Sequence, residues 1–232
     1  PTTPRRPARA HRPGPPAGER ASETGRVRTE ISVADLEPRR AYRLLTSTVL
    51  PRPIAWVSSR SADGVDNLAP HSFFTVASSR PPVVQFTSTG VKDTLRNVRA
   101  TEEFVVNLAP EWLQRKINET GTDFPPGVSE FAAVGIETEP SRTVAPPRVA
   151  GSPVALECRL HQLVEVGDST LVLGEVLHVA VAEQAMSPED DLPLPERLAP
   201  MARLGRNQWA TLGEIREVPR ETYAQRQQRL AD

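Results

Sequence analysis

The sequence predicts a mainly β protein with short helices, in which the strands form a barrel. Short apolar runs rich in β-branched residues recur along the chain, with turn residues between them. Few helix-compatible segments interrupt these runs, and the regular alternation of strand and helix typical of a Rossmann domain is missing. The 232 residues are enough for one domain with a large core.

The first half of the barrel is predicted from three strands and a helix. Residues 54–58 form the first strand, and Gly64 permits the tight turn after it because glycine can take a positive φ. Residues 67–70 lead into a second strand at 73–77, and two prolines end that strand before a third at 83–87. A helix follows from Thr94.

The second half contains the longest predicted strands. Residues 104–108 form a strand, residues 111–119 a helix, and a proline-rich loop region follows. Two long strands, 154–166 and 170–181, are joined by a Gly-Asp turn at 167–168 that indicates a hairpin. A last strand is expected at 209–215. We therefore expect the domain to span residues 26–217.

Both ends of the chain differ from this domain. Residues 1–25 are rich in proline and arginine and lack apolar periodicity, which predicts an extended or disordered arm that could wrap a partner. Residues 218–232 are polar and are expected to form a solvated helix, or an arm on a neighbouring subunit.

Composition excludes several classes of function. A net charge of -1 gives no reason to expect a nucleic acid or an anionic membrane surface as partner, and no apolar run approaches the roughly 20 residues that cross a bilayer. The one cysteine, Cys158, lies in a predicted strand and is expected to be a small core residue. No clustered histidines or cysteines indicate a metal site. A soluble cytoplasmic protein is expected.

Lys92-Asp93-Thr94 is the most informative short stretch. Lys92 is one of only two lysines, although the chain has 28 basic residues, and it stands where a predicted helix begins. Unpaired N–H groups and the helix dipole attract anions at such a point, and a lysine adds a compact positive charge. Phosphate is the natural ligand. The alternative is a surface helix capped by Asp93 or Thr94, with Lys92 in solvent.

Four motifs occur in the order and spacing of one protein family. They are Tyr42-Arg43-Leu44-Leu45, Pro-Arg-Pro-Ile-Ala-Trp-Val-Ser at 51–58, Asn-Leu-Ala-Pro-His-Ser-Phe-Phe at 67–74, and Lys92-Asp93-Thr94. With these motifs the chain resembles the flavin reductase-like, FMN-binding split-barrel proteins, particularly the flavoredoxin-like branch, over residues 33–215. The resemblance implies an FMN-binding split β-barrel, a homodimer, and FMN held near the subunit interface.

The resemblance also implies which residues bind FMN. The phosphate motif begins at Lys92, and Asp93 is interpreted there as a cap or a backbone N–H donor. The loop from Asn67 to Ser72 matches the flavin-lining loop, and the strand at Trp56 matches the one flanking the ring, although a tryptophan in such a strand is more often a core residue than a cofactor contact. The candidate cofactor-binding residues are Trp56, Val57, Ser58, Asn67, Leu68, Ala69, Ser72, Lys92, Asp93 and Thr94.

One histidine and two departures from the family pattern bear on the reaction. His71 lies inside the flavin-loop motif and is the candidate catalytic residue. Ser169 stands where related flavin reductases often have a histidine, which puts recognition of nicotinamide in question. Arg206 and Trp209 are expected to add bulk near the barrel mouth, on the substrate side of the site.

The function implied by the resemblance is NAD(P)H-dependent transfer of a hydride to flavin, with reduced flavin or electrons passed to a partner such as a monooxygenase. Two alternatives stay open at this point. One is a flavin-dependent enzyme that acts on a specialised small molecule. The other is a flavoredoxin-like electron carrier without NAD(P)H turnover of its own. The choice between NADH and NADPH, the final acceptor and the release of flavin are left open by the sequence.

Overall fold

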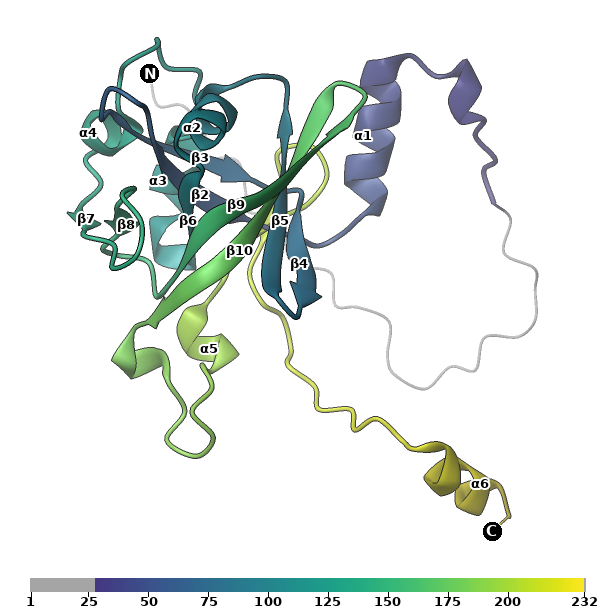
Figure 1. Cartoon of the computed structure of the whole chain (residues 1–232). Coiled ribbons are helices and arrows are strands. Elements are labelled where there is room, and N and C mark those ends of the chain that lie inside the picture. Colours follow the sequence, from purple (N-terminus) through teal and green to yellow (C-terminus); the bar gives the residue numbers. More distant parts are fainter. Residues whose placement is uncertain (1–27, 232) are drawn as a thin grey trace, which may run out of the picture. The chain divides into compact units, whose positions relative to one another are not determined.

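The computed structural model describes residues 28–231 (Figure 1). The chain divides into two compact units, Pro1–Glu37 and Pro38–Asp232. In the first unit the described residues contain one short 3-10 helix, η1 (Val33–Asp35), with no buried side chain. The expected Pro/Arg-rich arm at 1–25 lies outside the described residues.

The second unit is built on a seven-stranded antiparallel sheet with the order β3-β2-β6-β9-β10-β5-β4. The two longest strands, β9 and β10, form a hairpin through the middle of this sheet (Figure 1), and Gly167 takes a φ of 59° in its turn. The mainly β class is therefore confirmed. The seven strands are β2 (Ala55–Arg60), β3 (Asp66–His71), β4 (Phe74–Ser79), β5 (Pro82–Thr89), β6 (Glu103–Leu108), β9 (Val154–Val166) and β10 (Ser169–Val181).

The sheet curls so that the end of β3 approaches β5. The backbone N–H of Thr87 in β5 donates to the carbonyl of Phe73, 2.9 Å away, just after β3 ends. The ring Nδ1 of His71 lies 3.3 Å from the carbonyl oxygen of Thr87. These contacts bring the two sides of the barrel together at His71, where the site described below is found.

Strand β2 is buried on both faces because its alternate side chains enter two different cores. Ala55 and Val57 belong to the core inside the barrel, together with Phe86 and Phe104. Trp56 belongs to a second core on the opposite face. Burial of each large apolar side chain contributes about 1.5–3 kcal/mol, so these two cores fix the position of β2.

Helices cover the second core and the ends of the barrel. α2 packs against β2, and α3 and α4 pack against β3. The remaining elements of the unit are α1 (Pro38–Thr48), β1 (Arg52–Pro53), α2 (Asp93–Thr101), η2 (Glu111–Leu113), α3 (Gln114–Glu119), α4 (Glu130–Val134), β7 (Thr138–Glu139), β8 (Arg148–Val149), η3 (Glu183–Ala185), α5 (Pro195–Leu198), β11 (Ala202–Arg203), β12 (Trp209–Ala210) and α6 (Tyr223–Ala231).

Three elements differ from the sequence-based expectation. The strand expected at 209–215 is only the two-residue β12, because no described strand pairs with the chain after Ala210. The segment expected to lead into one strand forms two, β3 and β4, separated at residues 72–73. Helix α1 was not expected, and α4 lies in the region expected to be a loop.

Candidate functional site

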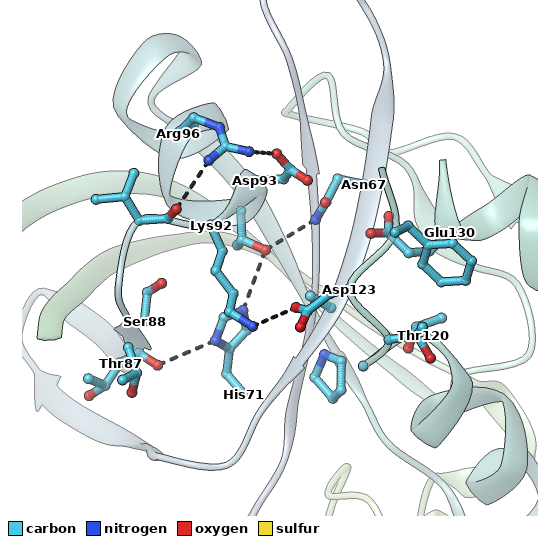
Figure 2. A pocket seen from close by; sticks show the side chains of 18 of the residues that line it. Asn67, His71, Thr87, Ser88, Lys92, Asp93, Arg96, Thr120, Asp123 and Glu130 are labelled. Carbon is cyan, nitrogen blue, oxygen red and sulfur yellow. Dashed lines mark hydrogen bonds and ion pairs between the residues drawn. The ribbon is translucent and has the colours of Figure 1, made fainter. Parts of the chain in front are cut away.

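A cavity of about 430 Å³ opens where β3, β5 and the start of α2 meet (Figure 2). This volume is in the range of small-molecule sites. Short side chains and the polar backbone of turns form much of its wall. It is lined by residues 67, 69–73, 87–89, 91–94, 96, 120–124 and 126, together with Tyr42 and Glu130.

The N-terminus of α2 faces this cavity. Lys92 is the N-cap residue, with an extended backbone, and no side chain caps the helix. The first intrahelical hydrogen bond runs from Arg96 N–H to the carbonyl of Lys92, 3.0 Å away. The N–H groups of the first turn therefore have no partner within the helix. Asp93 and Thr94, considered above as possible caps, are instead the first two helical residues.

The charged side chains at the cavity rim are exposed. Lys92 Nζ lies 2.9 Å from an oxygen of Asp123, and both side chains are mostly in solvent. Asp93 pairs with Arg96, whose guanidinium also donates to the carbonyl of Val91. Exposed pairs of this kind contribute about 0–1 kcal/mol. A ligand anion can therefore replace Asp123 as the partner of Lys92 at little cost.

Beneath the rim lies a buried polar group of side chains (Figure 2). Asn67, Thr94 and Glu130 are 6%, 1% and 5% exposed, and each lines the cavity. Figure 2 labels Asn67 and Glu130 among the residues around it. A carboxyl oxygen of Glu130 accepts a hydrogen bond from the backbone N–H of Leu68 at 2.9 Å. The side-chain amide of Asn67 lies 3.1 Å from Thr94 Oγ1. Buried polar groups at such distances order one another, so the floor of the cavity is preformed.

His71 is neutral at physiological pH. Burial lowers its pKa to about 4, and the positive charge of Lys92 acts in the same direction, against a raising contribution from the Thr87 carbonyl. Because that carbonyl can only accept, ring Nδ1 carries the hydrogen. Nε2 is then an acceptor and faces the hydroxyl of Thr94 at 3.5 Å. The imidazole also lies against Phe86, with ring centroids 4.7 Å apart.

The structure brings together His71 and six of the ten candidate FMN-binding residues. Four candidates do not line the cavity, since their side chains are buried in or beside the two cores. Of these, the indole Nε1 of Trp56 donates to Thr120 Oγ1 at 2.9 Å, and Thr120 itself lines the cavity. Residues that line the cavity are Asn67, Ala69, Ser72, Lys92, Asp93 and Thr94, and those that do not are Trp56, Val57, Ser58 and Leu68.

Several lining residues had not been singled out from the sequence. Residues 87–89 lie in β5, directly before the Lys92 motif. Residues 120–124 follow α3, in a segment where prolines and glycines indicate only a loop, and Glu130 is the first residue of α4. An amphipathic pattern could not have indicated Glu130, because α4 is only five residues long.

The two departures from the family pattern lie in different places. Ser169 pairs with Thr89, which lines the cavity, so the β9–β10 turn reaches its rim. Trp209 and Arg203 line a separate cavity with residues of α3, and the guanidinium lies over the indole at 4.8 Å. The bulk expected at the substrate side from Trp209 is thus not at the cavity beside Lys92.

Over residues 28–231, the structure contains no group of three or more His, Cys, Asp or Glu side chains arranged to hold a metal ion. In the same part of the chain, no helix has both the length and the apolar character needed to span a bilayer.

Residues 46–195 match the flavin reductase like domain. The chain belongs to the flavin reductase-like family. Together with the sheet described above, this membership gives it the split β-barrel fold of that family. An uncharacterised protein of Deinococcus radiodurans is 39% identical over 211 residues, which cover 86% of this chain and 93% of that protein.

Two solved structures share both the fold and a third of the sequence. Nitrilotriacetate monooxygenase component B from Bacillus cereus is 31% identical, with a TM-score of 0.79 over 83% of this chain and 99% of its own. The 2-nitrobenzoate 2-nitroreductase NbaA from Pseudomonas fluorescens is also 31% identical, with a TM-score of 0.79 over 84% and 98% of the two chains. These likenesses support a flavin-dependent oxidoreductase as the kind of protein.

Proposed function

We propose that the cavity binds FMN, with its phosphate at the N-terminus of α2. The observation that carries this proposal is the uncapped first turn of α2, which opens onto the cavity beside Lys92. Backbone N–H groups and a positive dipole end favour a phosphate there, and Lys92 adds a charge that only an exposed carboxylate now neutralises. Thr94 offers its hydroxyl next to the same turn.

Ala69 and Ser72 are proposed to line the flavin side of the cavity, because both are short enough to let a flat ring approach the backbone. Four buried residues that do not line the cavity would support this wall from the protein interior: Trp56, Val57, Ser58 and Leu68. FMN, when bound, supplies a ring system that accepts a hydride. The chain itself would bind and orient the ring and exclude water.

The proposed reaction is NAD(P)H-dependent reduction of flavin, and a partner monooxygenase is the proposed consumer. Its support is the 31% identity to nitrilotriacetate monooxygenase component B, over 83% of this chain and 99% of that one. His71 stays the candidate catalytic residue. Because it is neutral, it would act by orienting groups through Nε2, and not as a cation that stabilises reduced flavin.

A second candidate function is direct reduction of a small apolar molecule. An apolar cavity of about 390 Å³ shares Ser72 and Phe73 with the proposed FMN site, so a substrate there would lie beside the cofactor. The 31% identity to 2-nitrobenzoate 2-nitroreductase supports the same possibility.

The homodimer and the cytoplasmic location expected from the sequence also stay proposals. Exposed apolar side chains at helical spacing along α1, Tyr42, Leu45 and Val49, support a dimer.

Titration with FMN, followed by rapid mixing with NADH or NADPH, tests the proposed function. Quenching of FMN fluorescence on mixing with the protein is the expected sign of binding. Rapid loss of the oxidised flavin absorbance after NAD(P)H is then expected for a reductase. A protein that never binds FMN contradicts the site. Bound flavin that NAD(P)H leaves oxidised contradicts the reductase and favours an electron carrier, or a small-molecule enzyme reduced by another protein.

A further inference from the structure

The floor of the cavity contains a carboxyl group whose role the proposed phosphate contacts do not explain. Glu130 is 5% exposed and lines the cavity from α4. One of its oxygens accepts from the Leu68 N–H at 2.9 Å. The other lies 3.3 Å from one end of the Asn67 side-chain amide, and the opposite end of that amide lies 3.1 Å from Thr94 Oγ1. Glu130 is therefore linked to Thr94 through Asn67.

The amide of Asn67 can take two orientations, related by a half-turn of its terminal bond. When Glu130 is ionised, both of its oxygens only accept, so the NH2 group of Asn67 faces Glu130. The amide oxygen then accepts from the Leu68 N–H and from the Thr94 hydroxyl. In this state the hydroxyl hydrogen of Thr94 is used inside the floor and is withheld from the cavity.

When Glu130 carries a proton, its O–H can donate to the oxygen of Asn67, and the NH2 group turns toward Thr94 Oγ1. Thr94 then accepts from Asn67. Its own hydrogen is free to point to His71 Nε2, at 3.5 Å, or to an oxygen of a ligand. The proton on Glu130 thus decides whether Thr94 offers a hydrogen or a lone pair to the cavity.

We propose that Glu130 is a positioning residue that takes up a proton when the FMN phosphate binds, because only then does Thr94, which accepts from Asn67, turn its own hydrogen toward the anion. This proposal rests on the proposed function, and it adds a proton-linked mode of binding to it. Protonation of Glu130 also removes a buried negative charge near the phosphate. This favours binding of the anion, as the change in hydrogen-bond donors does.

Burial raises the pKa of Glu130, against the opposing effect of backbone N–H groups, chiefly that of Leu68. Burial thus favours the protonated form of Glu130 more than solvent does. The other charged or titratable groups that line the cavity are His71 on β3, Asp123 after α3, and Lys92, Asp93 and Arg96 at the start of α2. Burial lowers the pKa of His71 to about 4, so His71 stays neutral near physiological pH.

If binding needs the protonated form of a group, the affinity for the ligand falls as the pH rises past the pKa of that group, by up to about tenfold per pH unit. The phosphate of FMN ionises further near pH 6, which affects every variant alike. The informative quantity is thus the ratio of the FMN Kd of the wild type to that of Glu130→Gln. Glutamine keeps the acceptor for Leu68 and permanently donates to Asn67.

The test measures the FMN Kd by fluorescence quenching from about pH 5.5 to 8.5, for the wild type and Glu130→Gln. We expect the ratio to rise at least about fivefold across this range, following the linkage relation. Riboflavin, which lacks the phosphate, is the control ligand and should show a ratio that does not change with pH. A constant ratio for FMN overturns the inference while leaving the FMN site in place, whereas absence of FMN binding overturns both.

Proton uptake by the wild type gives a second readout that does not depend on the folding of a variant. Titration calorimetry in two buffers of different ionisation enthalpy gives the number of protons bound with each ligand. We expect net uptake with FMN and none with riboflavin near neutral pH. Equal values for the two ligands would overturn the inference.

Discussion

Lys92 combines two properties that a phosphate site needs at a single position. It is the N-cap of α2, so its backbone begins the uncapped turn, and its side chain brings a charge to the same rim. The chain contains one other lysine, Lys116, which bonds the carbonyl of Gly135. Lys116 does not line the cavity, and it is half-buried whereas Lys92 is exposed. Lys116 is thus a suitable control position for a substitution of Lys92.

Lys92→Ala is expected to weaken FMN binding by about 1.5–3 kcal/mol, the value of a charge-assisted contact, which is one to two orders of magnitude in Kd. Riboflavin affinity should change much less. The measurement is a fluorescence titration with both ligands, and Lys116→Ala is the control that should leave both affinities unchanged. Equal FMN affinity in the two variants would remove Lys92 from the phosphate site.

At the scale of elements, strand β9 holds the loop before β8 through one buried carboxylate. Glu157 is fully buried and accepts from Arg148 Nε at 2.8 Å. It also accepts from the backbone N–H groups of Arg142 and Thr143, at 2.8 and 2.6 Å. Three residues of this segment, Arg142, Thr143 and Arg148, are thus bound by a single side chain of the sheet, which holds the segment against β9.

The charge of Glu157 should make stability depend on acid. Burial alone would raise its pKa, but the hydrogen bonds from Thr143, Arg142 and Arg148 lower it from 4.5 to about 2. The stabilisation is therefore complete above about pH 4.5 and is lost as the pH falls toward 2. Urea unfolding of the wild type should show this loss, and Glu157→Gln should lack it.

At neutral pH, Glu157→Gln is expected to lower the free energy of unfolding by about 3–5 kcal/mol, because it leaves Arg148 buried without its charged partner. Glu139→Gln is the control. Glu139 also faces Arg148, at 3.4 Å, but its side chain is half in solvent, so its loss should cost about 0–1 kcal/mol. Equal losses of unfolding free energy in the two variants would show that burial of the carboxylate does not decide how much it contributes to stability.

At the scale of the whole molecule, α1 presents an apolar stripe to solvent. Tyr42, Leu45 and Val49 follow one another at helical spacing, and each is more than half exposed. Leu45 and Val49 also line the apolar cavity beside the proposed FMN site. Large apolar side chains gathered on one helix face usually mark an interface. A second copy of the chain is the proposed partner.

The double variant Leu45→Asp, Val49→Asp is expected to halve the mass measured by light scattering and to weaken FMN binding at least about tenfold, because buried charges at an interface are costly. Arg40→Asp, on the opposite side of α1, should change neither quantity. A wild type that is already a monomer would refute the dimer, and a dissociated variant with normal FMN affinity would place the site away from the interface.

Much of the sheet could be predicted from sequence because its signals are local. The hairpin of β9 and β10 was predicted almost to the residue, since its strands are runs rich in β-branched residues on either side of a Gly-Asp turn. α1 was not predicted although Tyr42, Leu45 and Val49 follow one another at helical spacing, because three apolar residues in so short a segment are a weak periodic signal. α4 escaped because it is a single short turn of helix in a proline-rich segment.

The sequence by itself determined the chemistry available at the site: a lysine at a helix start, a loop of small polar residues, and the flavin reductase-like motifs that connect them. Only the tertiary structure decided which buried polar groups meet. Thr94 lies 27 residues from Asn67, and Glu130 lies 62 residues from Leu68, yet they share one hydrogen-bonded floor. Local propensities depend on near neighbours in the chain, whereas such contacts exist only after the barrel has curled and α4 has packed against β3.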